Sequence, residues 1–323
     1  MSTVFQSRMP DSVAPERRVT ARVSIIIPCY NQGHYLGEAI DSVLAQTVPV
    51  DEIIVIDDGS TDATETVARQ YLTVRYLKQA NQGQCRARNR GITESSGDYL
   101  IFLDADDRLL PRNVELALEA FTRRPEAGFV CGDYRVIGLE DLRHRHDCAP
   151  RPDHYATLLS VRANFITLPG SVMFRRAALA DVGHWRLGLR ANPDIDLFLR
   201  VAYRFPIVCH HQVVAEYRRH HGQISKRLDV MLEAIMTVYR LHMPYIRTRP
   251  EYRAAYRAGV ELTRSACAEP LMWQMVAHAR AGEWRQAWSC FRALARYFPA
   301  DLMRFVLAKV KRMGRRTRPA AST

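Results

Sequence analysis

The sequence lacks the features that mark disulfide-stabilised secreted proteins, zinc ribbons and membrane-spanning proteins. Its 323 residues include seven cysteines, an odd number, and no Cys-x-x-Cys pair, so the cysteines do not resemble a disulfide framework. No run approaches the roughly 18 consecutive apolar residues that a membrane-spanning helix needs. No apolar secretory core precedes Arg22. These absences predict a reduced, cytoplasmic protein.

The charge of the chain is unevenly distributed. The 46 Lys and Arg residues exceed the 34 Asp and Glu residues, for a net charge of +12. A balance of this kind can indicate a nucleic-acid-binding protein, which needs basic residues spread over a binding face. Residues 301–323 alone contain seven basic residues and one acidic residue, which is half of the excess. The local excess favours a basic tail, and we expect no nucleic-acid partner.

The basic tail has the pattern of an amphipathic helix. Two interpretations are open: the helix lies in the interface of an anionic membrane, or its apolar side packs on the protein and the rest is solvated. The first would place the protein on the inner face of the cytoplasmic membrane. The apolar face is formed by Leu302, Met303, Val306, Leu307, Val310 and Met313, and the opposite face by Arg304, Lys309, Lys311 and Arg312.

Three short apolar runs in the first third of the chain each end in a polar turn. They span Val23 to Asn31, Glu52 to Asp62 and Asp98 to Asp107, and the first is followed by an apparent helix near residues 35–46. Buried strands alternating with helices predict an α/β fold with a mostly parallel sheet. Because ligands bind at the carboxyl edge of such sheets, the turn residues would share one site. Carboxylates there suit Mg²⁺ or Mn²⁺ and a phosphate-bearing substrate.

The order of these motifs resembles that of the family 2 glycosyltransferases, which are nucleotide-sugar-dependent enzymes with the GT-A fold. Four further segments continue the likeness: Asn81 to Gly91, Gly170 to Arg176, Asp194 to Arg200 and Tyr217 to His220. The resemblance implies a GT-A domain over residues 21–225, between a loose tail (1–20) and a helical C-terminal region (226–323). The helical region has candidate helices near 228–245, 251–267, 270–281 and 284–297 before the basic tail.

The resemblance implies a metal site built on the Asp-x-Asp motif. The second aspartate, Asp106, matches the residue that ligates Mn²⁺ or Mg²⁺, and the first, Asp104, matches the residue that approaches the sugar nucleotide. Asp107 could take either role. His220 matches a histidine that completes the metal site, although it could instead hydrogen-bond the diphosphate.

The same likeness assigns residues to the nucleotide. Asp58 matches the carboxylate that accepts a hydrogen bond from the imide nitrogen of uracil, thymine or guanine, and a UDP-sugar donor is favoured. Pro28 and Tyr30 resemble residues that wall the base pocket, although Tyr30 could also be an ordinary packing residue. Arg88 could face the nucleotide or hold the Asp104 loop in place.

An acceptor hydroxyl needs a base, because an alcohol attacks poorly until its proton is removed. Asp194 matches the catalytic base of the family, and Asp196 is its rival. The chain departs from the family pattern at Pro193, where a glutamate is expected. A separate cluster, His144, His146 and Cys148, has spacing that could bind zinc but lacks a fourth ligand.

The resemblance implies inverting, metal-dependent transfer of a sugar to an acceptor hydroxyl, on a glycan or a lipid-linked acceptor, in cell-surface glycan or polysaccharide biosynthesis. The Gln-x-x-Arg-Trp signature of processive synthases is absent, so one sugar per encounter is expected. The alternative is a nucleotide-sugar-binding protein of the same fold with impaired catalysis, which the substitution at Pro193 leaves open.

Overall fold

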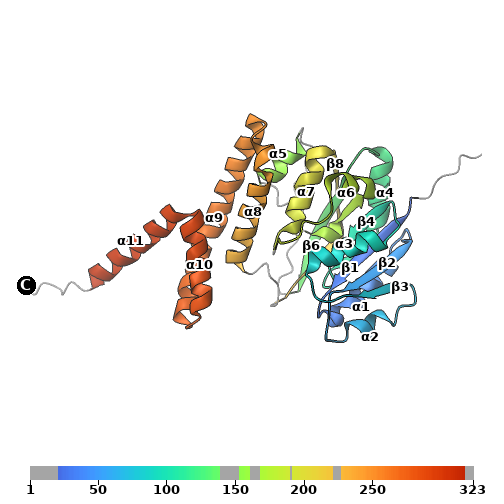
Figure 1. The fold of residues 1–323 in the computed structure, drawn as a ribbon, viewed down its shortest axis with the longest axis horizontal. Helices are drawn as coiled ribbons and strands as arrows, with labels where there is room; N and C mark the ends of the chain where they lie inside the picture. The colour runs from blue at the N-terminus through green and yellow to red at the C-terminus, as the bar shows by residue number, and fades with distance from the viewer. Residues whose placement is uncertain (1–20, 139–152, 161–167, 190, 221–226, 317–323) are drawn as a thin grey trace, which may run out of the picture.

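The computed structural model describes residues 21–138, 153–160, 168–189, 191–220 and 227–316, with side chains up to Ala308. The molecule is elongated, with an α/β part at one end and a series of helices leading to the C-terminus at the other (Figure 1). The predicted tail at 1–20 and the possible zinc ligands His144, His146 and Cys148 lie outside the described residues.

A single mixed sheet organises the α/β part. Four neighbouring strands are parallel, and β7 runs antiparallel to its neighbours β4 and β6. Strand β8 is parallel to β6, and the short β5 is antiparallel to β8. In spatial order the strands are β3 (Val74–Lys78), β2 (Glu52–Asp57), β1 (Val23–Cys29), β4 (Tyr99–Phe102), β7 (Val172–Arg175), β6 (Phe129–Gly138), β8 (Ile207–Arg219) and β5 (Arg108–Leu109).

The register of the parallel strands aligns their carboxyl ends. Cys29 of β1 pairs with Asp57 of β2, and Ile26 of β1 pairs with Phe102 of β4. The turns that follow these strands therefore emerge side by side. Helix α3 (Gln84–Glu94) packs so closely on β1 that a Cβ at Gly91 would collide with the Ile26 side chain. A residue without a side chain is required there.

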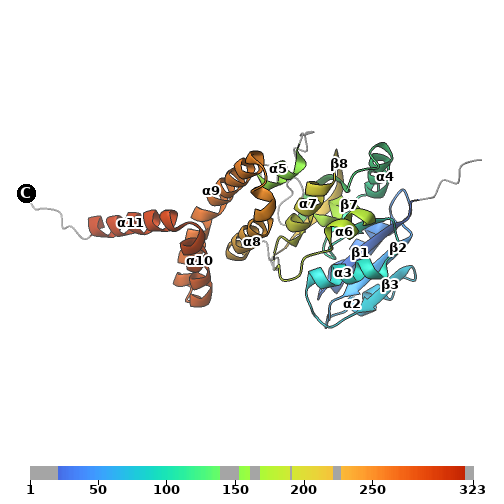
Figure 2. The ribbon, with the colours of Figure 1, turned by 45° about the horizontal axis from the view of Figure 1, so that its top comes forward.

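Helices cover both faces of the sheet, because successive side chains of each buried strand point to opposite sides. One apolar cluster lies between the sheet and helices α1 (Gly33–Leu44), α2 (Thr64–Ala68) and α4 (Asn113–Arg123). The other face carries α3, α6 (Arg176–Val182) and α7 (Pro193–Arg204), and Figure 2 shows this layering. A one-turn 3-10 helix, Pro169–Ser171, leads into β7.

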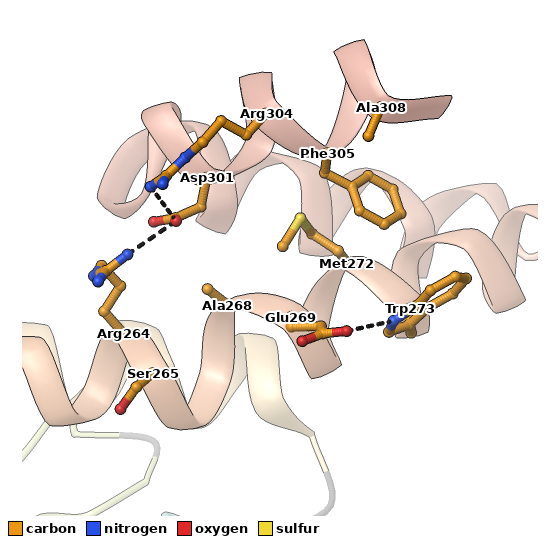
Figure 3. Close-up of a pocket in the computed structure, with 10 residues that line it drawn as sticks. All are labelled: Arg264, Ser265, Ala268, Glu269, Met272, Trp273, Asp301, Arg304, Phe305 and Ala308. Carbon is orange, nitrogen blue, oxygen red and sulfur yellow. Dashed lines mark hydrogen bonds and ion pairs between the residues drawn. The ribbon is translucent and has the colours of Figure 1, made fainter. Parts of the chain in front are cut away.

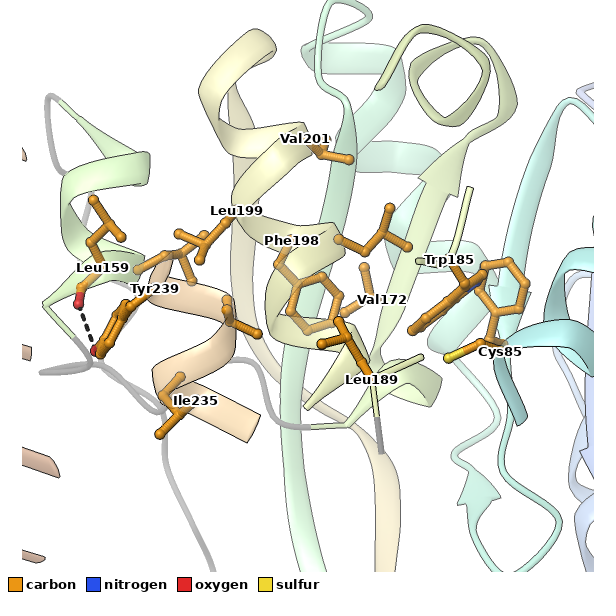
Figure 4. Close-up of a cluster of buried hydrophobic side chains, with 14 of the residues drawn as sticks. Cys85, Leu159, Val172, Trp185, Leu189, Phe198, Leu199, Val201, Ile235 and Tyr239 are labelled. Carbon is orange, nitrogen blue, oxygen red and sulfur yellow. Dashed lines mark hydrogen bonds between the residues drawn. The ribbon is translucent and has the colours of Figure 1, made fainter. Parts of the chain in front are cut away.

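The second cluster continues without interruption into the helical region. It joins Phe198 and Leu199 of α7 to Ile235 and Tyr239 of α8 (Leu228–Ile246), as Figure 4 shows. The Tyr239 hydroxyl also donates to the backbone oxygen of Leu159, in α5 (His154–Leu159), at 3.1 Å. The C-terminal helices therefore share a hydrophobic core with the sheet.

The remaining helices are α9 (Pro250–Arg280), α10 (Trp284–Tyr297) and α11 (Pro299–Arg316). The sequence suggested separate helices at 251–267 and 270–281, whereas the structure has one, with Pro270 inside it. A proline in a helix interior costs a hydrogen bond and crowds the preceding turn. Burial of Ala268, Leu271 and Met272 around it favours the continuous helix. Among the described residues, no helix is long and apolar enough to cross a membrane.

Candidate active site

A pocket of about 270 Å³ lies at the carboxyl ends of β1, β2 and β4. It brings together, from three separate segments of the chain, most of the side chains that we predicted to bind the sugar nucleotide or the metal. Its walls contain Pro28, Tyr30, Asp58, Asp104 and Asp106, together with Cys29, Gln32, Gln84, Ala87 and Tyr217.

Tyr30 is held out into solvent by the turn after β1. Its neighbour Asn31 has a left-handed backbone, with φ of 52°. The Asn31 side-chain oxygen accepts a hydrogen bond from the Thr61 backbone N–H at 2.8 Å, which fastens this turn to the one after β2. Tyr30 is 50% exposed and lines the pocket. Ordinary packing would bury the ring, so the structure leaves it available to stack on a flat ligand.

Asp58 is almost completely buried and is tied to the loop before α3. Its carboxylate accepts hydrogen bonds from the Gln79 side chain at 2.7 Å, the Gln82 N–H at 2.9 Å and the Gly83 N–H at 2.7 Å. A carboxylate offers roughly four acceptor sites. Three are used, which leaves capacity for one further donor from the pocket.

The adjacent Asp57 makes its contacts within the protein. It accepts hydrogen bonds from the Ser60 N–H at 2.7 Å and the Tyr76 hydroxyl at 2.5 Å, and it is fully buried.

Arg88 lies behind the pocket and does not form part of its wall. One guanidinium nitrogen donates to Asp104 Oδ1 at 2.5 Å, and the guanidinium carbon lies 4.4 Å from the centre of the Trp185 ring. Of the two roles that the sequence left open, the structure contains the contact that holds the Asp104 loop.

Trp185 is a component of this region for which the sequence carried no signal. The Asn89 side chain makes two hydrogen bonds with the backbone of Trp185. Its amide nitrogen donates to the Trp185 backbone oxygen at 2.8 Å, and its amide oxygen accepts from the Trp185 backbone N–H at 2.9 Å. The indole ring is 2% exposed and also packs edge-on against Phe102. The Arg-Asn pair of α3 therefore fixes a distant segment as well as the Asp-x-Asp loop.

Asp106, which lines the pocket, is in contact with His220. His220 Nε2 lies 2.9 Å from Asp106 Oδ2, and both side chains are partly exposed. Burial raises the pKa of the Asp106 carboxyl, and the negative charge of Asp104 adds to this rise, while the contact with His220 opposes it. A positive charge at this position would relieve the repulsion between the two carboxylates.

The donor atoms of this pair suit a divalent cation, because carboxylate and imidazole are both ligands of Mn²⁺. Within the described residues, no group of three or more His, Cys, Asp or Glu side chains is placed to hold a metal ion. A carboxylate and an imidazole together would leave coordination positions for substrate phosphates.

Arg218 attaches the end of β8 to the Asp-x-Asp loop. Its backbone N–H donates to Asp107 Oδ1 at 2.9 Å, and its side chain donates to the Asp106 backbone oxygen at 3.0 Å and to Glu38 at 2.6 Å. Asp107 is 1% exposed. It supports the loop from behind and does not form part of the pocket wall.

Asp194 lies in the first turn of α7 and is partly exposed. Burial raises its pKa to about 6, and the positive charge of Arg88 opposes the rise. Arg88 and Asp104 thus lie within electrostatic range, although Asp194 is not part of the wall of the 270 Å³ pocket. Pro193 occupies the first helical position, where proline is favoured because its fixed φ suits a helix start. The departure from the family pattern has a local structural use.

The Asp196 side chain is buried in the protein interior, where it pairs with basic residues. It is 0% exposed and lies 2.9 Å from Arg200 Nε and 3.3 Å from both Arg186 Nε and His242 Nε2. Burial acts to raise its pKa, but the hydrogen bond with His242 and the charges of Arg200 and Arg186 outweigh burial and lower it. These contacts leave Asp196 poorly placed to serve as a base.

A larger cavity, of about 430 Å³, lies between α9 and α11. Arg264 and Arg304 both point toward Asp301, at 3.0 and 2.8 Å, and the Trp273 N–H donates to Glu269 at 3.3 Å (Figure 3). Its main charged groups thus pair with one another, and no residue of the strand-end site lines it. We assign the chemistry to the smaller pocket.

Comparison with known proteins identifies the family. Residues 24–183 match the sequence model of glycosyl transferase family 2. The chain is 33% identical over 224 residues to an uncharacterized glycosyltransferase of Rickettsia prowazekii, covering 65% of this chain and 68% of the relative. The protein belongs to glycosyl transferase family 2 and is a glycosyltransferase.

Solved structures share the fold at low sequence identity. TarS residues 1–349 of S. aureus, in complex with UDP-GlcNAc, superpose with a TM-score of 0.55 and 16% identity, over 85% of this chain and 92% of that one. The mannosyltransferase PcManGT of Pyrobaculum calidifontis, in complex with GDP-Man and Mn²⁺, gives a TM-score of 0.56 and 20% identity, over 90% and 85%. The α/β architecture is therefore that of GT-A enzymes.

Proposed function

We propose that the protein transfers one sugar at a time from a nucleoside-diphosphate sugar to an acceptor hydroxyl, with inversion at the anomeric carbon. The supporting observation is that one pocket unites a half-exposed aromatic ring, Tyr30, with the carboxylates of Asp58, Asp104 and Asp106. An aromatic surface and an acceptor suit a nucleobase, and acidic groups that face a cation suit a diphosphate.

In this proposal the nucleobase of the donor lies between Pro28 and Tyr30. The imide N–H of the nucleobase donates to the remaining acceptor site of Asp58. Uracil satisfies that contact, as do thymine and guanine, and we favour a UDP-sugar. Arg88 acts as a positioning residue, because its ion pair orients Asp104 toward the ribose and sugar.

The acceptor approaches on the side of Asp194. Its carboxylate removes the hydroxyl proton while the acceptor oxygen bonds to the anomeric carbon from the face opposite the diphosphate. The bond from the anomeric carbon to the phosphate oxygen breaks, and its electron pair leaves with the diphosphate. A single in-line displacement of this kind inverts the configuration at that carbon.

Asp106 and His220 would hold Mn²⁺ or Mg²⁺ against the diphosphate. Such a cation stabilises the negative charge that accumulates on the leaving group. Support comes from the carboxylate–imidazole pair at 2.9 Å and from the Mn²⁺ that accompanies GDP-Man in the Pyrobaculum enzyme.

We further propose that the catalytic unit spans residues 21–225 and that the acceptor is a glycan or a lipid-linked precursor of a cell-surface polysaccharide. The basic tail would bring the protein to the inner face of the cytoplasmic membrane. A catalytically impaired nucleotide-sugar-binding protein is the second candidate, because Pro193 stands where the resemblance implies a glutamate.

Titration with UDP, GDP and TDP sugars, with and without Mn²⁺, tests these proposals. We expect metal-dependent binding of one nucleotide class and slow release of its free nucleoside diphosphate. Binding without any turnover, in the presence of varied glycan acceptors, would favour the impaired protein. Absence of binding to every nucleotide sugar would refute the proposed function.

A further inference from the structure

An aromatic ridge on α10 is exposed to solvent. It consists of Trp284, Trp288 and Phe291, which are 70%, 63% and 38% exposed. The spacing of four and three residues places them on one side of the helix. Trp288 and Phe291 also stack, with ring centres 5.2 Å apart. Contiguous large apolar side chains at the surface of a soluble protein mark an interaction site.

The ridge belongs to a firmly packed helix. Another side of α10 buries Ala287, Cys290, Ala293 and Leu294, and the last three belong to the core cluster. The aromatic side chains are therefore presented by a fixed helix with its own core-facing side already occupied.

The next helix also has exposed apolar side chains. Leu302 at the start of α11 is buried in the core cluster, but Met303, Val306 and Leu307 are 61%, 43% and 52% exposed. The sequence left open whether this apolar side packs on the protein. In the described part of α11, only its first turn does so fully.

Basic residues lie beside the ridge and along the segment that follows it. On α10, Arg285, Arg292 and Arg296 are exposed and form a row along the helix beside the ridge. Over residues 284–318 the sequence has ten basic residues and one acidic residue, Asp301, so this segment carries three quarters of the net charge of +12.

We propose that the Trp284–Trp288–Phe291 ridge inserts into the interface of an anionic lipid bilayer and that the surrounding basic residues hold it there. Tryptophan favours the membrane–water interface, where its ring is buried and its N–H stays hydrated. Each basic residue near an anionic surface adds to the attraction. A second copy of this chain would bring another strongly positive surface against the first, which disfavours self-association.

This inference extends the membrane contact beyond the tail, because it assigns the insertion to α10 and leaves α11 to supply mainly charge. The orientation of the pocket toward a lipid-linked acceptor rests on the proposed function. Binding to the bilayer does not, so the two can be tested separately.

The experiment measures sedimentation of the full chain with vesicles of phosphatidylcholine, alone or mixed with phosphatidylglycerol. We expect binding only to the mixed vesicles, weakening as salt screens the charges. The W284A/W288A variant should lose about tenfold or more of its partitioning, since two large aromatic surfaces no longer leave water. The matched control L44A/L72A removes two exposed leucines from the α/β part and should bind like the wild type.

Tryptophan emission gives an independent measurement. Vesicles should shift the emission of the wild type to shorter wavelength, and brominated lipids should quench it. Both effects should disappear in W284F/W288F, which keeps two aromatic rings and leaves Trp185 and Trp273 as the remaining fluorophores.

Several outcomes would refute the proposal. One is equal partitioning of W284A/W288A and the control. Another is loss of binding on truncation after Pro299 while W284A/W288A binds normally, which would make α11 the anchor. Concentration-dependent dimerisation abolished by W284A/W288A, without vesicle binding, would assign the ridge to a second copy, and binding to RNA alone would assign it to nucleic acid. UDP binding, measured on every variant, should stay unchanged and reports separately on the proposed function.

Discussion

Arg88 and Asp104 form an ion pair, 2.5 Å long, that joins helix α3 to the loop after β4. The arginine is 2% exposed and its guanidinium lies over the Trp185 ring. A planar fork can bond a carboxylate and stack on an aromatic ring at once, which a lysine ammonium cannot reproduce. The position of the Asp104 carboxylate in the pocket therefore depends on the packing of α3 and Trp185.

Arg88→Lys should weaken donor binding, because the charge remains but the direction of Asp104 is no longer fixed. We expect the Kd for UDP or a UDP-sugar to rise about tenfold, corresponding to the loss of one charge-assisted hydrogen bond of roughly 1.5 kcal/mol. Calorimetry measures this change. Arg90→Lys, on the exposed side of the same helix, is the control, and an equal loss in both variants would argue against a specific role for Arg88.

Asp194→Asn should abolish transfer and leave UDP binding nearly intact, since the base contacts the acceptor. In the wild type, kcat/KM should fall about tenfold for each pH unit below the Asp194 pKa of about 6 and level off above it, because the base must be ionised. Arg88 and Asp104 are the charged groups that face it. A profile without an acid limb near that pH would remove Asp194 from the base role.

Asp196→Asn should act mainly on stability. It replaces a buried carboxylate that pairs with Arg200 and Arg186 and leaves Arg200 buried, a loss of roughly 3 kcal/mol or more. Because the pKa of Asp196 is lowered, its contribution is present above the ordinary value of 3.8 and is lost as pH falls. Chemical denaturation measures the loss.

Asp194→Asn is the matched variant, two residues away. The pKa of Asp194 is raised, so its ionisation costs the folded state stability as pH rises from 3.8 to about 6. Removing the charge should leave stability at neutral pH unchanged or higher. Destabilisation of both variants to the same extent would contradict the division of roles between the two aspartates.

Asp106→Ala should lower kcat by roughly 10²-fold or more, the scale of losing a main electrostatic stabiliser of the leaving group. His220→Ala should raise the Mn²⁺ concentration needed for half-maximal activity. Asp98→Ala, an exposed aspartate at the opposite end of β4, is the control. Activity of Asp106→Ala that equals the wild type and persists in EDTA would exclude the metal assignment.

The sequence identified the strand-end residues because strands, turns and acidic motifs are local patterns. Asp58 and Asp104 follow short apolar runs, Pro28 lies near the end of another, and the parallel register brings them together. Trp185 could not be found in this way, since its position depends on a bidentate contact with Asn89, 96 residues earlier. The burial of Asp196 was equally hidden, because His242 contacts it from 46 residues further along the chain and Arg186 from the loop before its helix.

The boundaries of the C-terminal helices show the same limit. The low helix preference of proline led us to predict that a helix ends before Pro270. Burial of the apolar residues around Pro270 in the shared core instead favours a continuous helix. The exposure of the α10 ridge could not be predicted without knowing which faces of that helix pack on its neighbours. Tertiary contacts determine both the length of α9 and the exposed face of α10.

The attachment of β8 to the Asp-x-Asp loop has a consequence for biosynthesis. His220 and Arg218 follow the loop by 114 and 112 residues, so a chain still on the ribosome contains the acidic loop long before the groups that neutralise it. In that interval Arg88, which precedes the loop, can pair with Asp104, but Asp106 and Asp107 would repel each other and lack the contacts that β8 supplies. Ligand affinity should therefore arise only once translation has passed β8, and a prematurely terminated chain would carry the nucleotide-facing motifs without a working site.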